Sequence, residues 1–275
     1  MAKEGKCVGV PTPLAELTKL TRGWQPSDLI ILAGRPGQGK TSLLIAMAKI
    51  AAQYEIPVCL YELEMSSISL YNKLVLSECE IGLSNFMSGY MSEYDWKEFN
   101  EAEYRLARLP IYVDDNPMVN MAYVRNHSKL MKKKGLCGLI GIDYLQLADM
   151  ETEKKNRNRE REVADTSRMA KIIAKELEVP VILLSQLNRE VEKRSEAKPK
   201  LSDLRDSGAI EQDADIVMFT YLPAKYNVLT DDKGVSTEGT GIISFAKHRN
   251  GACRDIFYKH NDSMTKIFDF TTEIF

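Results

Sequence analysis

Residues 34–41 read Gly-Arg-Pro-Gly-Gln-Gly-Lys-Thr, which is the complete pattern of a phosphate-binding loop. In such a loop the glycines let backbone N–H groups point at phosphate oxygens, the lysine reaches the β- and γ-phosphates, and the hydroxyl holds Mg²⁺. A mostly apolar run over 28–33 suits a buried strand, and apolar residues recur at helical spacing over 43–51. Strand, glycine loop and helix in this order place the positive end of a helix dipole at the phosphate. The sequence therefore predicts a nucleotide-binding site here.

We expect the whole loop to contact the nucleotide phosphates, with Lys40 on the β- and γ-phosphates and Thr41 on Mg²⁺. The residues predicted to bind the nucleotide are Gly34, Arg35, Pro36, Gly37, Gln38, Gly39, Lys40, Thr41 and Ser42.

Apolar strand candidates alternate with amphipathic helical segments along most of the chain, which predicts an α/β fold with a mainly parallel sheet covered on both faces. The later strand candidates are 58–63, 111–113, 136–142, 181–184 and 216–220, and the helical segments lie near 68–79, 93–107, 121–134 and 162–178. The C-terminal part differs, because runs over 242–248 and 253–260 flank an Asn-Gly pair, a strong hairpin signal. With a third run over 266–270, antiparallel strands are expected at one end of the sheet.

Composition limits the setting in which such a chain works. The 275 residues contain no repeat, low-complexity linker or composition change, so residues 1–275 are expected to form a single domain. No apolar run approaches the roughly 18 residues needed to cross a bilayer, and because nothing at the N-terminus resembles a signal peptide, none is expected. Five scattered cysteines without a C-x-x-C pair suit a reducing cytoplasm. The formal charge of −2 means that any nucleic-acid contact requires a local concentration of Lys and Arg.

Two carboxylates follow strand candidates where ligands gather in parallel sheets, at the carboxyl ends of the strands. Asp143 ends an apolar strand and is expected to hold the magnesium hydration shell, although many strands end in Asp for capping reasons alone. Glu64 could polarise the water that attacks the γ-phosphate, or it could simply favour the dipole of the following helix. The residues alone leave both interpretations of Glu64 open, and Glu62 is a weaker candidate base.

Three further polar segments also allow two interpretations each. Gln186 ends a strand, where its amide either contacts the γ-phosphate or satisfies a strand-to-loop turn. The basic stretch 154–161, with Lys154, Lys155, Arg157 and Arg159, either attracts a phosphate backbone or is solvated surface. Lys247 and Arg249, at the hairpin turn, are either solvated or reach the γ-phosphate of a neighbouring subunit as an arginine finger does.

The segment 202–210 contains Arg205, Asp206 and Gly208, which supply a cation, a hydrogen-bonding group and a glycine that permits close backbone approach. These groups suit the grip of a phosphodiester, although their spacing alone does not prove it.

Together these segments resemble the C-terminal ATPase domain of the bacterial and phage replicative DNA helicases, the DnaB family, which has a RecA-like fold. The resemblance runs from about Gly9 to Phe270, and five motifs occur in the right order. They are Leu-Glu-Met-Ser at 63–66, Ile-Asp-Tyr-Leu-Gln-Leu at 142–147, Leu-Ser-Gln-Leu-Asn-Arg at 184–189, the segment from Ser-Asp-Leu-Arg at 202–205 to Ile-Glu-Gln-Asp-Ala-Asp at 210–215, and Lys-His-Arg-Asn-Gly at 247–251.

The resemblance implies an ATP-driven motor with Mg²⁺, in which Glu64 activates water, Asp143 supports the metal and Gln186 senses the γ-phosphate. It further implies that Arg205, Asp206 and Gly208 hold single-stranded DNA, and that Lys247 and Arg249 act in trans on the nucleotide of the next subunit.

Members of this family normally carry a helical N-terminal domain, and only about ten residues precede the matching region here. A homo-oligomeric, hexameric ring is therefore expected to be weakened, and contacts with a primase or loader become uncertain. A RecA- or RadA-like recombination factor and a nucleotide-dependent interaction module are the alternative functions. No membrane contact is expected, and the expected location is cytoplasmic.

Overall fold

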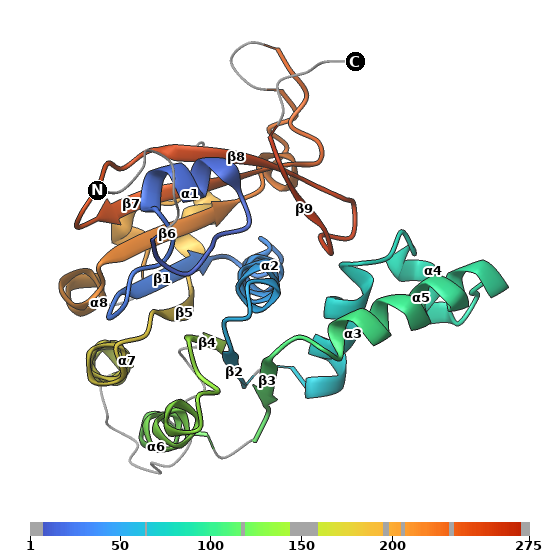
Figure 1. Ribbon diagram of the computed structural model, residues 1–275. Helices are drawn as coiled ribbons and strands as arrows, with labels where there is room; N and C mark the ends of the chain where they lie inside the picture. The colour runs from blue at the N-terminus through green and yellow to red at the C-terminus, as the bar shows by residue number, and fades with distance from the viewer. Residues whose placement is uncertain are drawn as a thin grey trace.

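The computed structural model describes residues 8–63, 65–116, 119–143, 159–194, 198–204, 207–230 and 234–270. They contain one nine-stranded sheet in the order β3-β2-β4-β5-β1-β6-β7-β8-β9 (Figure 1). Strands β1 to β6 run parallel, and β7, β8 and β9 are added antiparallel at one end. The strands are β1 (Leu29–Gly34), β2 (Val58–Glu62), β3 (Ile111–Asp114), β4 (Leu139–Asp143), β5 (Val181–Gln186), β6 (Ile216–Tyr221), β7 (Thr240–His248), β8 (Asp255–His260) and β9 (Ile267–Asp269).

Helices cover both faces of this sheet, as the alternation of strands and helices predicts. The helices are α1 (Ala15–Thr21), α2 (Lys40–Gln53), α3 (Ser67–Leu76), α4 (Leu83–Ser88), α5 (Glu93–Leu106), α6 (Met121–Lys133), α7 (Arg159–Leu177) and α8 (Ser207–Asp213). Short 3₁₀ helices span Arg189–Lys193, Leu201–Asp203 and Pro223–Tyr226. No helix in the described ranges is long and apolar enough to span a membrane.

The buried strand β1 divides the hydrophobic core into two layers. Ile30 and Leu32 pack with apolar residues of α1, α2 and α3 on one face, whereas Leu29, Ile31 and Ala33 pack with those of α6, α7 and α8 on the other. Figure 1 shows α6, α7 and α8 along one side of the sheet and α2 on the other, with α3, α4 and α5 extending beyond β3. Every residue of β1 is buried. This explains why its sequence is apolar throughout and does not alternate between apolar and polar residues.

The mainly parallel sheet with antiparallel C-terminal strands is confirmed, with strand and helix ends shifted by a few residues. The run at 136–142 becomes a strand only at Leu139, because the exit from α6 occupies the residues before it. There Gly135 adopts φ +74°, and the N–H of Leu136 donates to the carbonyl of Met131 at 2.9 Å. The short helices α1, α4 and α8 lack a long apolar repeat, and the sequence did not predict them.

The tight Asn-Gly turn predicted for the C-terminal hairpin is wrong. The β7–β8 ladder begins at the pair Ser244 and Asp255, so ten residues lie between these partners. Neither Asn250 nor Gly251 is among the described residues with positive φ, which a two-residue primed turn would require. The end of β7 instead stays paired with β6, where His248 lies opposite Ile216. That pairing extends β7 past the point at which β8 leaves it.

Candidate active site

The phosphate loop connects the carboxyl end of β1 to the amino end of α2. Gly37 and Gly39 adopt φ values of +73° and +83°, a region that other residues enter only with strain. A Cβ atom on Gly34 would lie 2.7 Å from the Cγ2 atom of Thr220, so the loop also requires a glycine there for close packing against β6. No side chain caps the amino end of α2 at Gly39. This is the arrangement in which the first N–H groups of a helix face an anion.

Side chains of the loop hold it against the rest of the protein. Arg35 is buried, donates to the carbonyl of Leu187 at 2.9 Å and pairs with a carboxylate oxygen of Glu192 at 2.8 Å. Gln38 is also buried, and its side-chain oxygen accepts from the N–H of Leu222 at 2.8 Å. These two side chains support the loop. The predicted contact of Arg35 and Gln38 with a nucleotide is therefore left to their backbone N–H groups, and it stays a prediction.

Lys40 lies folded over the loop, with its Nζ atom donating to the carbonyls of Gly34 at 3.0 Å and Arg35 at 3.3 Å. The lysine amine thus already lies over the loop that is predicted to hold phosphate.

Thr41 and Asp143 meet beside the loop, as predicted for a metal-supporting pair. The Thr41 hydroxyl donates to the Oδ2 atom of Asp143 at 2.9 Å, and Asp143 is almost completely buried at the end of β4. A hydroxyl and a carboxylate oxygen are ligands that Mg²⁺ prefers, directly or through water. The donor chemistry of this pair therefore fits a magnesium ion.

Glu62 lies opposite Asp143 in the β2–β4 register and is 2% exposed. Its Oε1 atom accepts from the N–H of Met65 at 3.1 Å, so Glu62 holds the turn that follows β2. Glu64 itself lies outside the described residues, and its role as base stays a prediction. The residues on either side of it are described. The N–H of Leu63 donates to the carbonyl of Asp143 at 2.9 Å, and Met65 lines the cavity described next.

A cavity of about 440 Å³ opens at the loop, a volume in the usual range for small-molecule sites. Gln186 lines it from the end of β5, where it is paired in register with Gly34, so the two predicted phosphate contacts are neighbours. The other lining residues are Pro36, Gly37, Gly39, Lys40, Thr41, Ser42, Ile45, Met65, Lys73, Leu83, Lys225, Asp262, Ser263, Met264 and Thr265.

Sequence reasoning missed two contributions to this cavity. Lys225 follows β6 and donates to the carbonyl of Gly37 at 2.5 Å. It could have been found, because residues after a parallel strand gather at the same edge as the loop. The turn at 261–266 also reaches the loop, and Met264 occupies the space that a Cβ on Gly39 would need. No sequence signal indicated this turn, since its place depends on the antiparallel register of β8 and β9.

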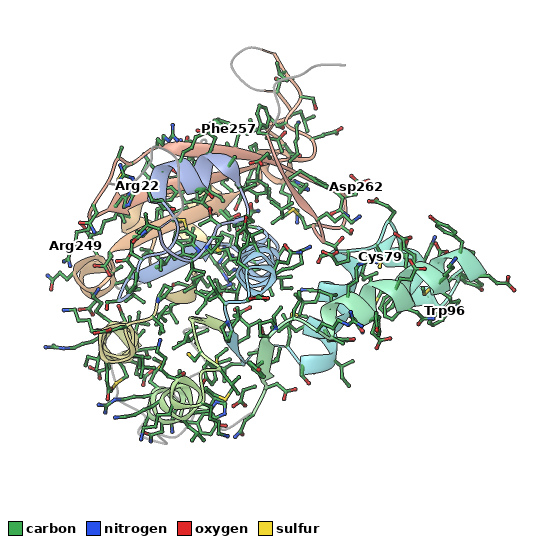
Figure 2. All side chains as sticks on the ribbon, in the orientation of Figure 1. Arg22, Cys79, Trp96, Arg249, Phe257 and Asp262 are labelled. Atoms are coloured by element: carbon green, nitrogen blue, oxygen red, sulfur yellow. The ribbon has the colours of Figure 1, made fainter. Side chains whose placement is uncertain are left out.

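Lys247 and Arg249, the two cations predicted to act as a finger, lie at the opposite edge of the same sheet. This amino edge is the one where the parallel strands begin, and the phosphate loop lies at the carboxyl edge, where they end. The N–H of Arg249 donates to the carbonyl of Asp215, directly before β6, whereas Gly34 packs against Thr220 near the carboxyl end of β6. From 215 to 220 the chain advances by five residues, which corresponds to roughly 17 Å along the strand. In Figure 2 the labelled Arg249 is well separated from the labelled Asp262, which lines the cavity. An arginine at this edge cannot reach the phosphate loop of its own chain.

Lys247 and Arg249 both contact main-chain carbonyls in the segment from α8 to the start of β6, Lys247 through its amine and Arg249 through its backbone N–H. The Nζ atom of Lys247 donates to the carbonyl of Ala214 at 2.6 Å and to that of Glu211. Burial and then the charge of Arg249 lower the pKa of the Lys247 amine. The backbone N–H of Arg249 lies 2.8 Å from its acceptor, the carbonyl of Asp215. The Arg249 side chain is 54% exposed, and its Nη1 atom donates to the Oδ1 atom of Asp215 at 3.2 Å.

Most of the predicted DNA contacts lie outside the described residues: Arg205, Asp206, Lys154, Lys155 and Arg157, with Arg159 described only as the first residue of α7. Gly208 is in the first turn of α8 and exposed, and no atom of the described residues is recorded within 4 Å of the place a Cβ would take. Its surface is therefore open to close approach by a ligand backbone.

A model of the family described as the DnaB-like helicase C terminal domain matches residues 9–269. The chain belongs to this family. The replicative DNA helicase DnaB of Geobacillus stearothermophilus is 40% identical over 250 residues, which are 90% of this chain and 54% of that protein. The replicative DNA helicase DnaC of Bacillus subtilis (strain 168) is also 40% identical over 250 residues, with the same coverage of 90% and 54%. The chain thus spans about half the length of the curated relatives it matches.

Solved structures give the same family and a RecA-like fold. A solved ATPase domain superposes with a TM-score of 0.89 at 31% identity, covering 98% of this chain and 93% of that one. A DnaB-like replicative helicase studied for its interactions with primase also gives a TM-score of 0.89, at 30% identity, with 98% and 63% coverage. The family resemblance inferred from the five sequence motifs is confirmed.

Proposed function

We propose that this DnaB-family chain is the ATP-hydrolysing motor of a replicative DNA helicase, which translocates on single-stranded DNA and separates the duplex. The observation that carries the proposal is the placement of the phosphate loop and Arg249 at opposite edges of the sheet. A phosphate loop with the Thr41–Asp143 pair lies at one edge, and the exposed Arg249 lies at the other, out of reach of that loop. A ring of subunits would bring each loop against the cations of its neighbour.

Within one site, the loop N–H groups and Lys40 bind the phosphates of ATP, while Thr41 and Asp143 hold Mg²⁺. When bound, the metal neutralises charge on the β- and γ-phosphate oxygens. Glu64 takes a proton from the attacking water, and Gln186 contacts the γ-phosphate beside the loop. The cations Lys247 and Arg249 of the adjacent chain then stabilise the charge that develops on the transferred phosphoryl group.

DNA binds through Arg205, Asp206 and Gly208 with the basic stretch 154–161. The segment 202–210 follows Gln186 in the chain, so the γ-phosphate contact can alter the grip on DNA. One of the similar solved structures is named for its interactions with primase, and a primase or a loader is accordingly the protein partner that we propose here.

The test mixes two inactive variants, Lys40→Ala and Arg249→Ala, and measures ATP hydrolysis together with displacement of a strand from a forked duplex. Each variant alone should be inactive in both assays. Mixed oligomers should recover part of both activities, because some interfaces combine an intact loop with an intact arginine. Differently tagged chains that copurify establish mixing. No recovery in such oligomers counts against the divided site, and hydrolysis without any strand displacement counts against the helicase.

A further inference from the structure

Asp215 lies directly before β6, and its oxygens accept four hydrogen bonds from described residues. Its Oδ2 atom accepts from the N–H of Leu29 at 2.8 Å and from the amine of Lys171 on α7. Its Oδ1 atom accepts from the Nη1 atom of Arg249 at 3.2 Å, and its own carbonyl accepts from the N–H of Arg249 at 2.8 Å. The Asp215 side chain is only 6% exposed.

Two partners, Lys171 and the backbone of Leu29, hold one oxygen of this carboxylate in place. Burying a carboxylate is costly unless a charge and hydrogen bonds compensate it. Lys171, 14% exposed, supplies the charge and is itself held by the carbonyl of Ser27 at 2.8 Å. With Oδ2 occupied by Lys171 and Leu29, the other oxygen is directed at Arg249, which is mostly exposed. The pair thus runs from a fixed buried group to a side chain on the surface.

A free arginine side chain visits many rotamers, and most of them point its guanidinium away from any one target. Here the backbone and the guanidinium of Arg249 are both bound to the same residue, Asp215. Only one of the guanidinium nitrogens is used by that bond, so further N–H donors are available to a phosphate. This is the geometry of a donor oriented before its ligand arrives.

We propose that Asp215 is a positioning residue, which orients Arg249 toward the γ-phosphate held by the neighbouring subunit. The inference rests on the proposed function, because it assumes that Arg249 acts in trans. Asp215 touches neither the nucleotide nor the reacting atoms in this arrangement. Its contribution is the direction of the guanidinium, and Lys171 contributes by fixing the carboxylate.

The variant Asp215→Asn keeps the size of the side chain and an oxygen acceptor but removes the charge. We expect kcat for ATP hydrolysis to fall about ten- to a hundredfold, the range that follows from loss of orientation at a reacting group. KM for ATP should stay nearly constant, because the intact loop of the other subunit binds the substrate. A rise in KM with unchanged kcat would contradict a positioning role.

Subunit mixing separates this role from a merely structural one. Asp215→Asn mixed with Lys40→Ala should recover hydrolysis, since the first chain supplies a good loop and the second a well-oriented Arg249. Asp215→Asn mixed with Arg249→Ala should recover nothing, because both chains lack a working arginine. Recovery in the second mixture would place Asp215 at the nucleotide of its own chain and overturn the proposal, as would no recovery in the first mixture.

The mixture of Lys40→Ala with Arg249→Ala is the reference. If this mixture recovers no hydrolysis in mixed oligomers, the divided site itself is wrong, and the role of Asp215 is wrong with it. If it recovers hydrolysis but Asp215→Asn does not behave like Arg249→Ala in the mixtures, only the inference about Asp215 is wrong. Should the unpaired Lys171 unfold the chain, Asp215→Asn combined with Lys171→Met removes both buried charges and takes the same mixing test. Glu78→Gln breaks an unrelated ion pair, with Lys49 at 2.7 Å, and should leave kcat unchanged.

Discussion

The two edges of the sheet present different chemical groups. At the carboxyl edge the phosphate loop offers backbone groups, and Lys40 lies over the loop that should hold phosphate. At the amino edge side chains from three distant segments, Asp215, Lys171 and Arg249, form a buried-to-surface ion-pair network. The geometry of the first edge depends on the local chain, whereas the second presents a cation by tertiary packing. In the function that we propose, each edge supplies half of one nucleotide site, and two chains complete it.

The largest expected effect tests the carboxyl edge alone. Lys40→Ala should abolish ATP turnover and weaken nucleotide binding, because it removes the mobile cation of the loop.

Glu64→Gln should leave binding intact and lower turnover about 10²–10⁴-fold, since an amide cannot accept a proton from water. Steady-state hydrolysis and nucleotide titration separate the two. If Glu64→Gln turns ATP over normally, Glu62 becomes the next candidate base, although its carboxylate is engaged by the N–H of Met65.

The contrast between the edges also explains what could be predicted from sequence. The carboxyl edge comes from a contiguous motif and from residues that end parallel strands, such as Asp143 and Gln186, and parallel strands bring such ends together. The position of Lys247 and Arg249 relative to that edge depends on the pairing of β7 with β6. A two-residue period cannot give that register, so their distance from the loop could not be predicted.

Asp215 shows the same limit at a single residue. It was part of a recognised motif, but nothing in the motif indicated Lys171, 44 residues earlier, as its partner. The β7–β8 pairing was predicted correctly, but the tight turn between the two strands was not, for a related reason. Asn-Gly favours a tight turn locally, while pairing of His248 with Ile216 holds the chain in another path. In both places tertiary contacts decide the outcome, and local sequence does not contain them.

A medium effect concerns the residues that we propose to bind DNA. Arg205→Ala should weaken binding of single strands of all sequences alike, because a phosphate contact reads no bases. The slope of log affinity against log salt should fall by about 0.7 for each phosphate that is no longer neutralised. ATP hydrolysis without DNA should change little, as Arg205 lies outside the phosphate loop. The competing contact is the stretch 154–161. If neutralising that stretch removes binding while Arg205→Ala leaves affinity and slope unchanged, the assignment of Arg205 is wrong.

The smallest expected effect is on stability at the amino edge, where Asp28 lies beside Asp215. Burial, and next the charge of Asp215, raise the pKa of the Asp28 carboxyl to about 6 from an ordinary value of 3.8. A raised carboxyl pKa favours folding only while the group is protonated. Below pH 3.8 the carboxyl is protonated in the folded and the unfolded chain alike and costs no stability. As the pH rises from 3.8 through about 6, the unfolded chain gives up this proton more readily than the folded chain, and the free energy of unfolding falls.

Asp28→Asn should therefore stabilise the protein above pH 6 and have little effect near pH 4. Because Asp28 is only half-buried, solvent screening limits the gain at pH 7.5 to about 1 kcal/mol, or roughly 2 °C in Tm for a chain of this size. Asp115→Asn is the matched control of opposite sign. The N–H of Ser67 donates to Asp115 at 2.7 Å and lowers the pKa of that carboxyl, so its removal should cost stability at neutral pH and nothing in acid. Urea unfolding of Asp28→Asn from pH 4 to pH 8, and of Asp115→Asn from pH 8 to well below pH 3.8, measures the two trends. A gain for Asp28→Asn that is the same at every pH would mean that the carboxyl is not titrating near 6, and the amino edge would then hold its charges without a penalty.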